Sequence, residues 1–209
     1  MTQKEKYNCV INFYKKKIKE FGTTNKGLGW ESKYKNNIRY TMIKNIIKKN
    51  YKGKLRLLDF GCGISGLHIF LKRSRVAHNY TGIDTSKSII NFCKKKFKKN
   101  NYYNFNILKS KKKFGEYDVV VLNGLFTIKD RLRDVEMYKY IIQILKILKK
   151  NINGLMIINF LIDNPDWKNE KNFYPNTKVL KSKLKKSISN KIYVIKLPKV
   201  FENIFILKI

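Results

Sequence analysis

The chain has 209 residues and a mass of 24.9 kDa, enough to bury a substantial core without disulfides or metal ions but too few for a second full domain. Lys and Arg total 47 against 14 Asp and Glu, a net charge of +33, yet 43% hydrophobic and 13% aromatic residues indicate a globular protein rather than a disordered basic tail. The longest strongly apolar stretch, residues 154–162, is far shorter than the roughly 20 residues of a membrane-spanning helix. The N-terminal residues lack the apolar run of a signal peptide, and the three cysteines neither pair evenly nor have metal-ligand spacing. We therefore expect a cytoplasmic protein with no membrane insertion and no metal.

The basic composition does not by itself indicate a partner. Of the 47 basic residues 41 are Lys and 6 are Arg, whereas Ala77 is the single alanine. This skew is typical of A/T-rich codons, and proteins that read bases or clamp phosphates favour Arg for its planar guanidinium. A nucleic-acid partner is therefore an alternative that the charge alone does not favour.

Apolar periodicity predicts two helices followed by alternating strands and helices. Residues 7–21 and 38–47 carry helical stripes, with a loop rich in Gly and Asn over 23–30 between them. From residue 54 the pattern changes to short apolar runs separated by amphipathic helices, which is the βαβ order of a parallel sheet. The expected strands cover 55–60, 80–84, 102–108, 117–122 and 154–162, and the main expected helices follow residue 66 and cover 86–99 and 134–150.

The C-terminal part has a different pattern. A short helix containing Leu180, Leu184 and Ile188 precedes two apolar runs, 192–197 and 201–209. Their connector is too short for a crossover helix, so these strands must pair antiparallel. We predict one domain over 1–209, with a helical N-terminal cap (1–53) and an α/β core (54–209): a doubly wound, mostly parallel seven-stranded sheet with helices on both faces and an antiparallel C-terminal hairpin.

A glycine-rich turn, residues 61–66 (Gly-Cys-Gly-Ile-Ser-Gly), lies between the first strand and its helix. Such a turn lets a ligand approach backbone N–H groups, and taken alone it also fits a dinucleotide site or an ordinary turn. Asp59, two residues before the first glycine, would repel a pyrophosphate and attract an ammonium or sulfonium group. Asp84 ends the next strand, where a carboxylate can accept from both hydroxyls of a ribose. The pattern favours a nucleoside ligand with a cationic amino-acid tail.

At these positions the sequence resembles the class I S-adenosylmethionine-dependent methyltransferases, whose fold is Rossmann-like. Residues 57–63, 80–84 and 118–124 resemble successive motifs of that family, and the likeness covers nearly the whole chain. Residues 26–30 (Lys-Gly-Leu-Gly-Trp) and 123–126 (Asn-Gly-Leu-Phe) are similar, more narrowly, to a small bacterial branch often associated with modification of surface sugars.

The resemblance implies S-adenosylmethionine as the cofactor and a set of residues around it. Asp59 and the glycine turn would surround the methionine moiety, Asp84 would hold the ribose, and Asn123 would lie beneath the sulfonium. Asn106, where the family commonly has Asp, would border the adenine, and the third glycine of the family pattern falls at Ser65. The full expected set is Asp59, Gly61, Cys62, Gly63, Asp84, Thr85, Asn106, Ile107 and Asn123.

The acceptor pocket is expected from Trp30, Phe126 and Asn159, because ligands of such sheets lie beyond the carboxyl ends of the strands. No general base can be assigned. His68 is interpreted as a packed or exposed side chain and His78 as loop surface, and Asp118 begins its strand, away from the site.

These features predict methyl transfer to an oxygen of a small polar acceptor, such as a sugar or phosphorylated sugar intermediate of surface polysaccharide. One alternative is an RNA methyltransferase whose basic surface, with the lysine run at residues 94–99, holds phosphates. A less favoured alternative is an NAD-dependent oxidoreductase, because Asp59 opposes a pyrophosphate.

Overall fold

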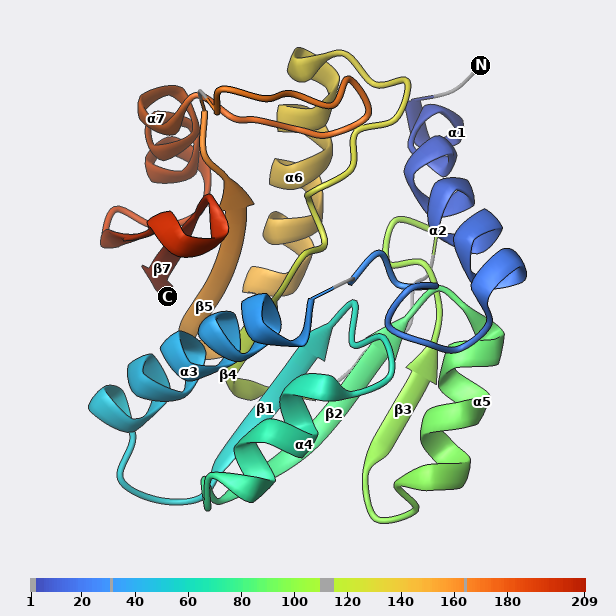
Figure 1. Cartoon of the computed structure of the whole chain (residues 1–209). Helices are drawn as coiled ribbons and strands as arrows, with labels where there is room; N and C mark the ends of the chain where they lie inside the picture. Colours follow the sequence, from blue (N-terminus) through green and yellow to red (C-terminus); the bar gives the residue numbers. More distant parts are fainter. Residues whose placement is uncertain (1–2, 31, 110–114, 164) are drawn as a thin grey trace.

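A seven-stranded sheet with the order β3-β2-β1-β4-β5-β7-β6 organises the chain (Figure 1). The computed structural model describes residues 3–30, 32–109, 115–163 and 165–209. Five strands are parallel: β1 (Leu55–Phe60), β2 (His78–Asp84), β3 (Asn101–Asn104), β4 (Tyr117–Leu122) and β5 (Ile152–Leu161). The last strand, β7 (Glu202–Lys208), inserts antiparallel between β5 and β6 (Ile192–Leu197). The doubly wound sheet and its C-terminal hairpin are confirmed.

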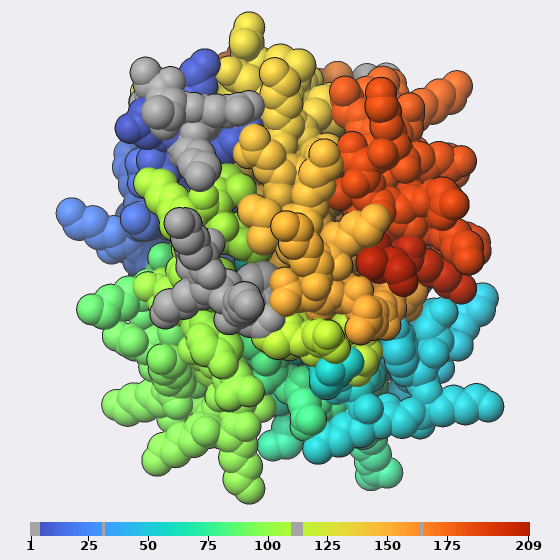
Figure 2. Space-filling view, turned by 180° about the vertical axis from the view of Figure 1, so that it is seen from behind, coloured from blue at the N-terminus to red at the C-terminus, as the bar shows by residue number. Residues whose placement is uncertain are grey.

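Helices cover both faces of this sheet. One face packs against α3 (Lys33–Asn50), α4 (Gly66–Arg73) and α5 (Lys87–Lys96), and α3 and α4 lie in front of the strands in Figure 1. The other face packs against α2 (Asn8–Phe21), α6 (Asp134–Lys149) and α7 (Thr177–Ser187). Figure 2 shows α6 and the C-terminal segment, coloured yellow to red, over this second face. The four-residue α1 (Gln3–Lys6) precedes α2, and a 3-10 turn, η1 (Pro198–Val200), joins β6 to β7.

Strand alternation explains why the central strands are apolar throughout. Leu57 and Val119 point into the core under α3 to α5, whereas their neighbours Leu58 and Val120 point into the core under α6 and α7. All four side chains are fully buried, because helices cover both sides of β1 and β4. No helix of the described residues combines the length and apolarity needed to cross a membrane.

Polar caps fix where three of the helices begin. The Ser32 hydroxyl accepts from the backbone N–H of Lys35, and Asn176 caps α7 in the same way. Ser86 accepts from the N–H of Ile89 at the start of α5, two residues after β2 ends. This cap places the first turn of α5 directly beside the carboxyl end of β2.

Two sequence predictions about strand boundaries were wrong. The third strand ends at Asn104 rather than at residue 108, because the Asn106 side chain accepts from the N–H of Leu108 (3.0 Å) and turns the chain. His78 begins β2 instead of lying in a surface loop, and its ring is partly buried.

Candidate functional site

The glycine turn between β1 and α4 forms the centre of the site. Gly61 and Gly63 have φ angles of 84° and 49°, which L side chains rarely adopt. A Cβ on Gly61 would also lie 2.9 Å from Leu125 Cδ1, and one on Gly63 would lie 2.7 Å from Leu28 Cδ1. Both positions therefore favour glycine for their backbone conformation, and a Cβ at either would also displace a leucine methyl group. Ser65, at the third glycine of the family pattern, takes a left-handed conformation without being glycine.

Asp84 joins this turn to the next loop. Its Oδ2 accepts from the N–H of Gly63 (3.2 Å), and its Oδ1 accepts from the N–H of Ser86 (2.9 Å). Burial raises the pKa of the Asp84 carboxyl, and these backbone donors oppose the rise. A carboxylate has about four lone-pair positions, so acceptor capacity remains for ligand hydroxyls.

Asp59 lies deeper, at the carboxyl end of β1. The side chain is 3% exposed, and its Oδ2 accepts from the Tyr80 hydroxyl at 2.7 Å. Burial raises the pKa of Asp59 to about 7, with a smaller contribution from Asp84, while the Tyr80 hydrogen bond lowers it. A cationic group bound nearby would favour the ionised carboxylate, so the position suits an ammonium group and disfavours an anion.

Two adjoining hollows lie between the glycine turn and the segment that follows α2. The larger, about 100 Å³, is lined by Asp84, Thr85, Trp30 and other residues, and the smaller, about 30 Å³, by Asp59 and Cys62 among others. Small-molecule pockets usually have roughly 300–1,000 Å³. Leu28 and Trp30 line both hollows, so we expect their side chains to move when a ligand of nucleoside size binds.

The loop after β4 forms the opposite wall. Asn123 lines both hollows, and its Oδ1 is buried without a hydrogen-bond partner among the described residues. An orphaned buried acceptor facing a hollow fits an electron-poor ligand group, because leaving it unpaired costs free energy. Gly124 has a φ angle of 75°, and a Cβ there would lie 2.3 Å from Trp30 Cζ2, so the Trp30 ring lies close against the Gly124 backbone.

A buried polar network holds Gly124 in place. Its N–H donates to Asn159 Oδ1 (2.6 Å), and Asn159 Nδ2 donates to Glu202 Oε2 (2.7 Å). Arg39 Nε donates to both oxygens of Glu202 at 2.9 Å, and the Arg39 guanidinium lies 4.6 Å from the centre of the Trp30 ring. The network thus connects the last strand and α3 to the wall of the site.

The structure brings most of the predicted cofactor residues together. Around the hollows lie Asp59, Gly61, Cys62, Gly63, Asp84, Thr85 and Asn123, together with Trp30. Asn106 and Ile107 do not line either hollow: the Asn106 side chain closes its own turn, and Ile107 is buried in the core. Phe105 lines the larger hollow beside them, because β3 ends early.

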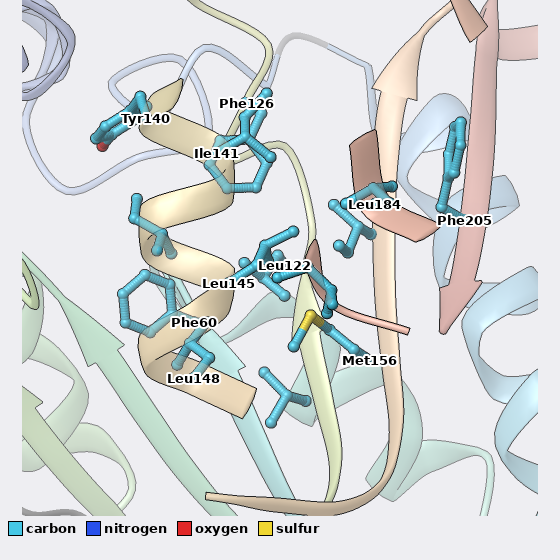
Figure 3. Close-up of a cluster of buried hydrophobic side chains, with 14 of the residues drawn as sticks. Phe60, Leu122, Phe126, Tyr140, Ile141, Leu145, Leu148, Met156, Leu184 and Phe205 are labelled. Carbon is cyan, nitrogen blue, oxygen red and sulfur yellow. The ribbon is translucent and has the colours of Figure 1, made fainter. Parts of the chain in front are cut away.

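Of the three predicted acceptor residues, Trp30 alone lines the hollows beside the glycine turn. Phe126 is fully buried and stacks on Phe160, with ring centres 5.6 Å apart, so its assignment to a pocket wall was wrong. Figure 3 shows Phe126 beside Tyr140 and Ile141 of α6. Asn159 is 4% exposed and acts through Gly124.

Sequence reasoning missed the contribution of α2. Tyr14 and Ile18 of α2 line the larger hollow with Leu28, and the Tyr14 hydroxyl donates to the Gly124 carbonyl at 3.4 Å. The helical stripe that contains Tyr14 and Ile18 was visible, but it did not indicate that part of the stripe faces a ligand site instead of the core.

Comparison with known proteins gives a consistent result. Residues 58–151 match the sequence model of a methyltransferase domain family. The S-adenosylmethionine-dependent methyltransferase SibL, in its apo form, is similar over 88% of this chain and 57% of its own, with a TM-score of 0.67 and 11% identity. An O-methyltransferase family protein from Burkholderia thailandensis is similar over 82% of this chain and 55% of its own, with a TM-score of 0.62 and 11% identity. The methyltransferase domain of bacterial CtHen1 is similar over 84% of this chain and 100% of its own, with a TM-score of 0.60 and 14% identity.

These likenesses establish the Rossmann-like α/β fold of methyltransferases. No curated protein sequence matches the chain significantly. The chain spans little more than half the length of the first two structures. The domain match and the fold together imply S-adenosylmethionine as the cofactor, and the donor set described above fits that molecule.

Proposed function

We propose that this chain transfers a methyl group from S-adenosylmethionine to an oxygen of a small polar acceptor, such as a sugar or a phosphorylated sugar intermediate of surface polysaccharide. The observation that carries the proposal is a pair of acids, the buried Asp59 and the half-buried Asp84, at the carboxyl ends of adjoining strands on either side of the glycine turn. Bound there, S-adenosylmethionine supplies an electrophilic methyl group on a sulfonium.

The residues of the chain would bind and align the cofactor and the acceptor rather than activate the acceptor chemically. Asp84 would accept from ribose hydroxyls while the N–H of Gly63 fixes the carboxylate. Asp59 would face the ammonium group, and the unpartnered Oδ1 of Asn123 would face the positive end of the ligand. Methyl transfer in line needs alignment above all, and orientation of reactants contributes roughly 7–11 kcal/mol.

The acceptor side favours a small molecule. The walls around Asn123 and Gly124 are narrow, and Trp30 together with Leu28 encloses them. The excess of lysine on the surface favours approach of an anionic acceptor. RNA is the weaker alternative, because a concavity lined by six cations lies at the opposite edge of the sheet.

The test incubates the purified chain with methyl-labelled S-adenosylmethionine and two acceptor pools, one of sugars and sugar phosphates and one of RNA. The expected result is label in the small-molecule pool. Mass spectrometry should then identify the labelled compound as an O-methyl product. Label in RNA alone would contradict the proposal. Binding of S-adenosylhomocysteine, measured by calorimetry in parallel, shows whether the cofactor assignment holds when no acceptor is found.

A further inference from the structure

A second concavity lies at the amino ends of the strands, on the opposite edge of the sheet from the glycine turn. It encloses about 660 Å³ and lies at the starts of β1 and β2 and just before β3, below the strands in Figure 1. The sheet separates it from the methyl-donor site by the full length of β1, which at six residues is about 20 Å. We call this concavity the basic groove.

The charge of the basic groove is one-sided. Six exposed cations line it, and none of its described lining residues is Asp or Glu. None of these six cations has an ion pair within the described part of the chain. The C-termini of α4 and α5 add together about one negative charge, which is far from balancing them. The six are Lys54, Lys72, Arg75, Lys96, Lys98 and Lys99.

One of these cations, Arg75, lines the groove with an unfavourable backbone conformation. Arg75 follows the end of α4 with a φ angle of 53°, in the left-handed region. Helices usually place glycine at such a position, so a non-glycine residue there is strained. The backbone N–H of Arg75 donates to the Lys72 carbonyl, and that of Val76 to the Leu71 carbonyl, which holds the conformation.

The floor of the groove is a chain of neutral polar groups. His78 Nδ1 donates to the Val76 carbonyl (2.7 Å), so His78 Nε2 is the acceptor for His68 Nδ1 at 3.0 Å. His68 Nε2 then accepts from the Asn100 amide at 2.9 Å. Burial, with His78 and Lys72 nearby, lowers the pKa of His68 to about 4. Tyr80 and Phe97 pack against the His68 ring, and neither is charged.

A dense set of unpaired cations around a neutral floor suits a ligand with several adjacent negative charges. Such a ligand neutralises repulsion among the lysines and releases their counterions. We propose that the basic groove is a second binding site, which takes ligands with two or more adjacent phosphate groups. Free oligophosphates and the backbone of a nucleic acid both present this chemistry.

The test uses sodium tripolyphosphate and a short single-stranded RNA, titrated calorimetrically into the full chain between about 50 and 200 mM NaCl. The chain has 2 histidines and both line the groove, so imidazole NMR signals report on this site alone. Saturation should shift both histidine signals and raise the pKa of His68, because an anion favours the imidazolium. Affinity should fall with added salt.

Matched variants separate a site from diffuse attraction. Replacing Lys72, Arg75 and Lys98 by Gln should weaken binding at least about tenfold and reduce its salt dependence. The control replaces Lys139, Lys183 and Lys186, which line a concavity at α6 and α7, by Gln and should change affinity less than about twofold. Tighter binding of RNA than of tripolyphosphate identifies a polymer ligand, and the reverse order identifies a compact one; both support the site.

Equal losses in the two triple variants, unmoved histidine signals at saturation, or no binding at low salt would overturn the proposal. An Asp84→Ala chain should bind tripolyphosphate as the parent does. The groove proposal and the methyl-transfer proposal can therefore fail independently.

Discussion

The two edges of the same parallel strands carry opposite chemistry. At the carboxyl edge, two acids and a glycine turn surround two small hollows. At the amino edge, six cations surround an open groove, and two histidines form its floor. β1 and β2 contribute to both edges, so the backbone is shared and the side chains make the difference.

This difference shows that the few acidic residues of the chain are better indicators of function than its many lysines. The chain has 14 Asp and Glu among 209 residues, and three of them, Asp59, Asp84 and Glu202, lie buried or half-buried at the carboxyl edge. A buried carboxylate costs free energy unless it is hydrogen-bonded or paired, and each of these three is. Lysines at the surface carry no such cost and are therefore weaker indicators of function.

The largest effect is expected at the buried ion pair of the carboxyl edge. Glu202→Ala should lower the free energy of unfolding by about 3–5 kcal/mol, because it leaves the Arg39 guanidinium buried without its partner. Urea denaturation measures this. The matched control is Asp118→Ala, which removes a partly exposed partner of the exposed Arg56 at the amino edge and should cost much less. Equal losses of unfolding free energy in the two variants would show that the ion pairs at the two edges do not differ in their contribution to stability.

A second prediction separates stability from binding at Asp59. Between about pH 4 and 7 the folded protein keeps a proton on Asp59 that the unfolded chain has released, so this group makes stability fall as the pH rises through that window. Asp59→Asn removes this loss and should be more stable than the parent at pH 8, by roughly 1–3 kcal/mol.

The same variant should bind S-adenosylhomocysteine at least about tenfold more weakly, because an amide cannot neutralise the ammonium group. Unfolding at pH 5 and pH 8, with calorimetry at pH 8, checks both effects. A variant that is less stable at pH 8 would contradict the assignment of a buried, strained charge to Asp59.

A smaller effect is expected from opening the hollows. Leu28→Ala removes the side chain that packs on Gly63, so S-adenosylhomocysteine should associate severalfold faster. Stopped-flow fluorescence follows this through Trp30, which lines both hollows. Lys26→Ala, an exposed change in the same segment, is the control. Unchanged association rates in both variants would mean that the segment does not limit entry.

The smallest effect tests the independence of the two edges. The triple replacement of Lys72, Arg75 and Lys98 by Gln should change the affinity for S-adenosylhomocysteine by less than about twofold, because these side chains lie at the other end of β1. Calorimetry at moderate salt measures this. A tenfold change would show that the groove and the methyl-donor site are coupled.

Local patterns in the sequence were sufficient for most of the fold. The run at 117–122, in which Asp118 is the single polar residue, predicted β4 with its observed ends, because a strand buried on both faces needs no polar alternation. The short connector 198–200 likewise predicted the antiparallel hairpin. The third strand was predicted too long, since Phe105, Ile107 and Leu108 are apolar, but the Asn106 side chain closes a turn there.

The site was predictable where motif and strand end coincide, and not where distant segments meet. Arg39 and Glu202 are 163 residues apart, and no local pattern connects them. The available signals were an arginine within a helical stripe of a chain rich in lysine, and one acid in an apolar last strand. For Phe126 the loop position was right but the orientation was not, because packing on Phe160 turns the ring into the core.

The most direct test of the central claim is calorimetric titration of S-adenosylhomocysteine into the parent chain and Asp84→Ala. If Asp84 accepts from the ribose hydroxyls, as proposed, its loss should weaken binding at least tenfold, about 1.4 kcal/mol. Circular dichroism and the histidine NMR signals of the free chain check that the variant is folded. Equal affinities in two folded chains, or no binding to the parent, would contradict the assignment of this edge to the methyl donor.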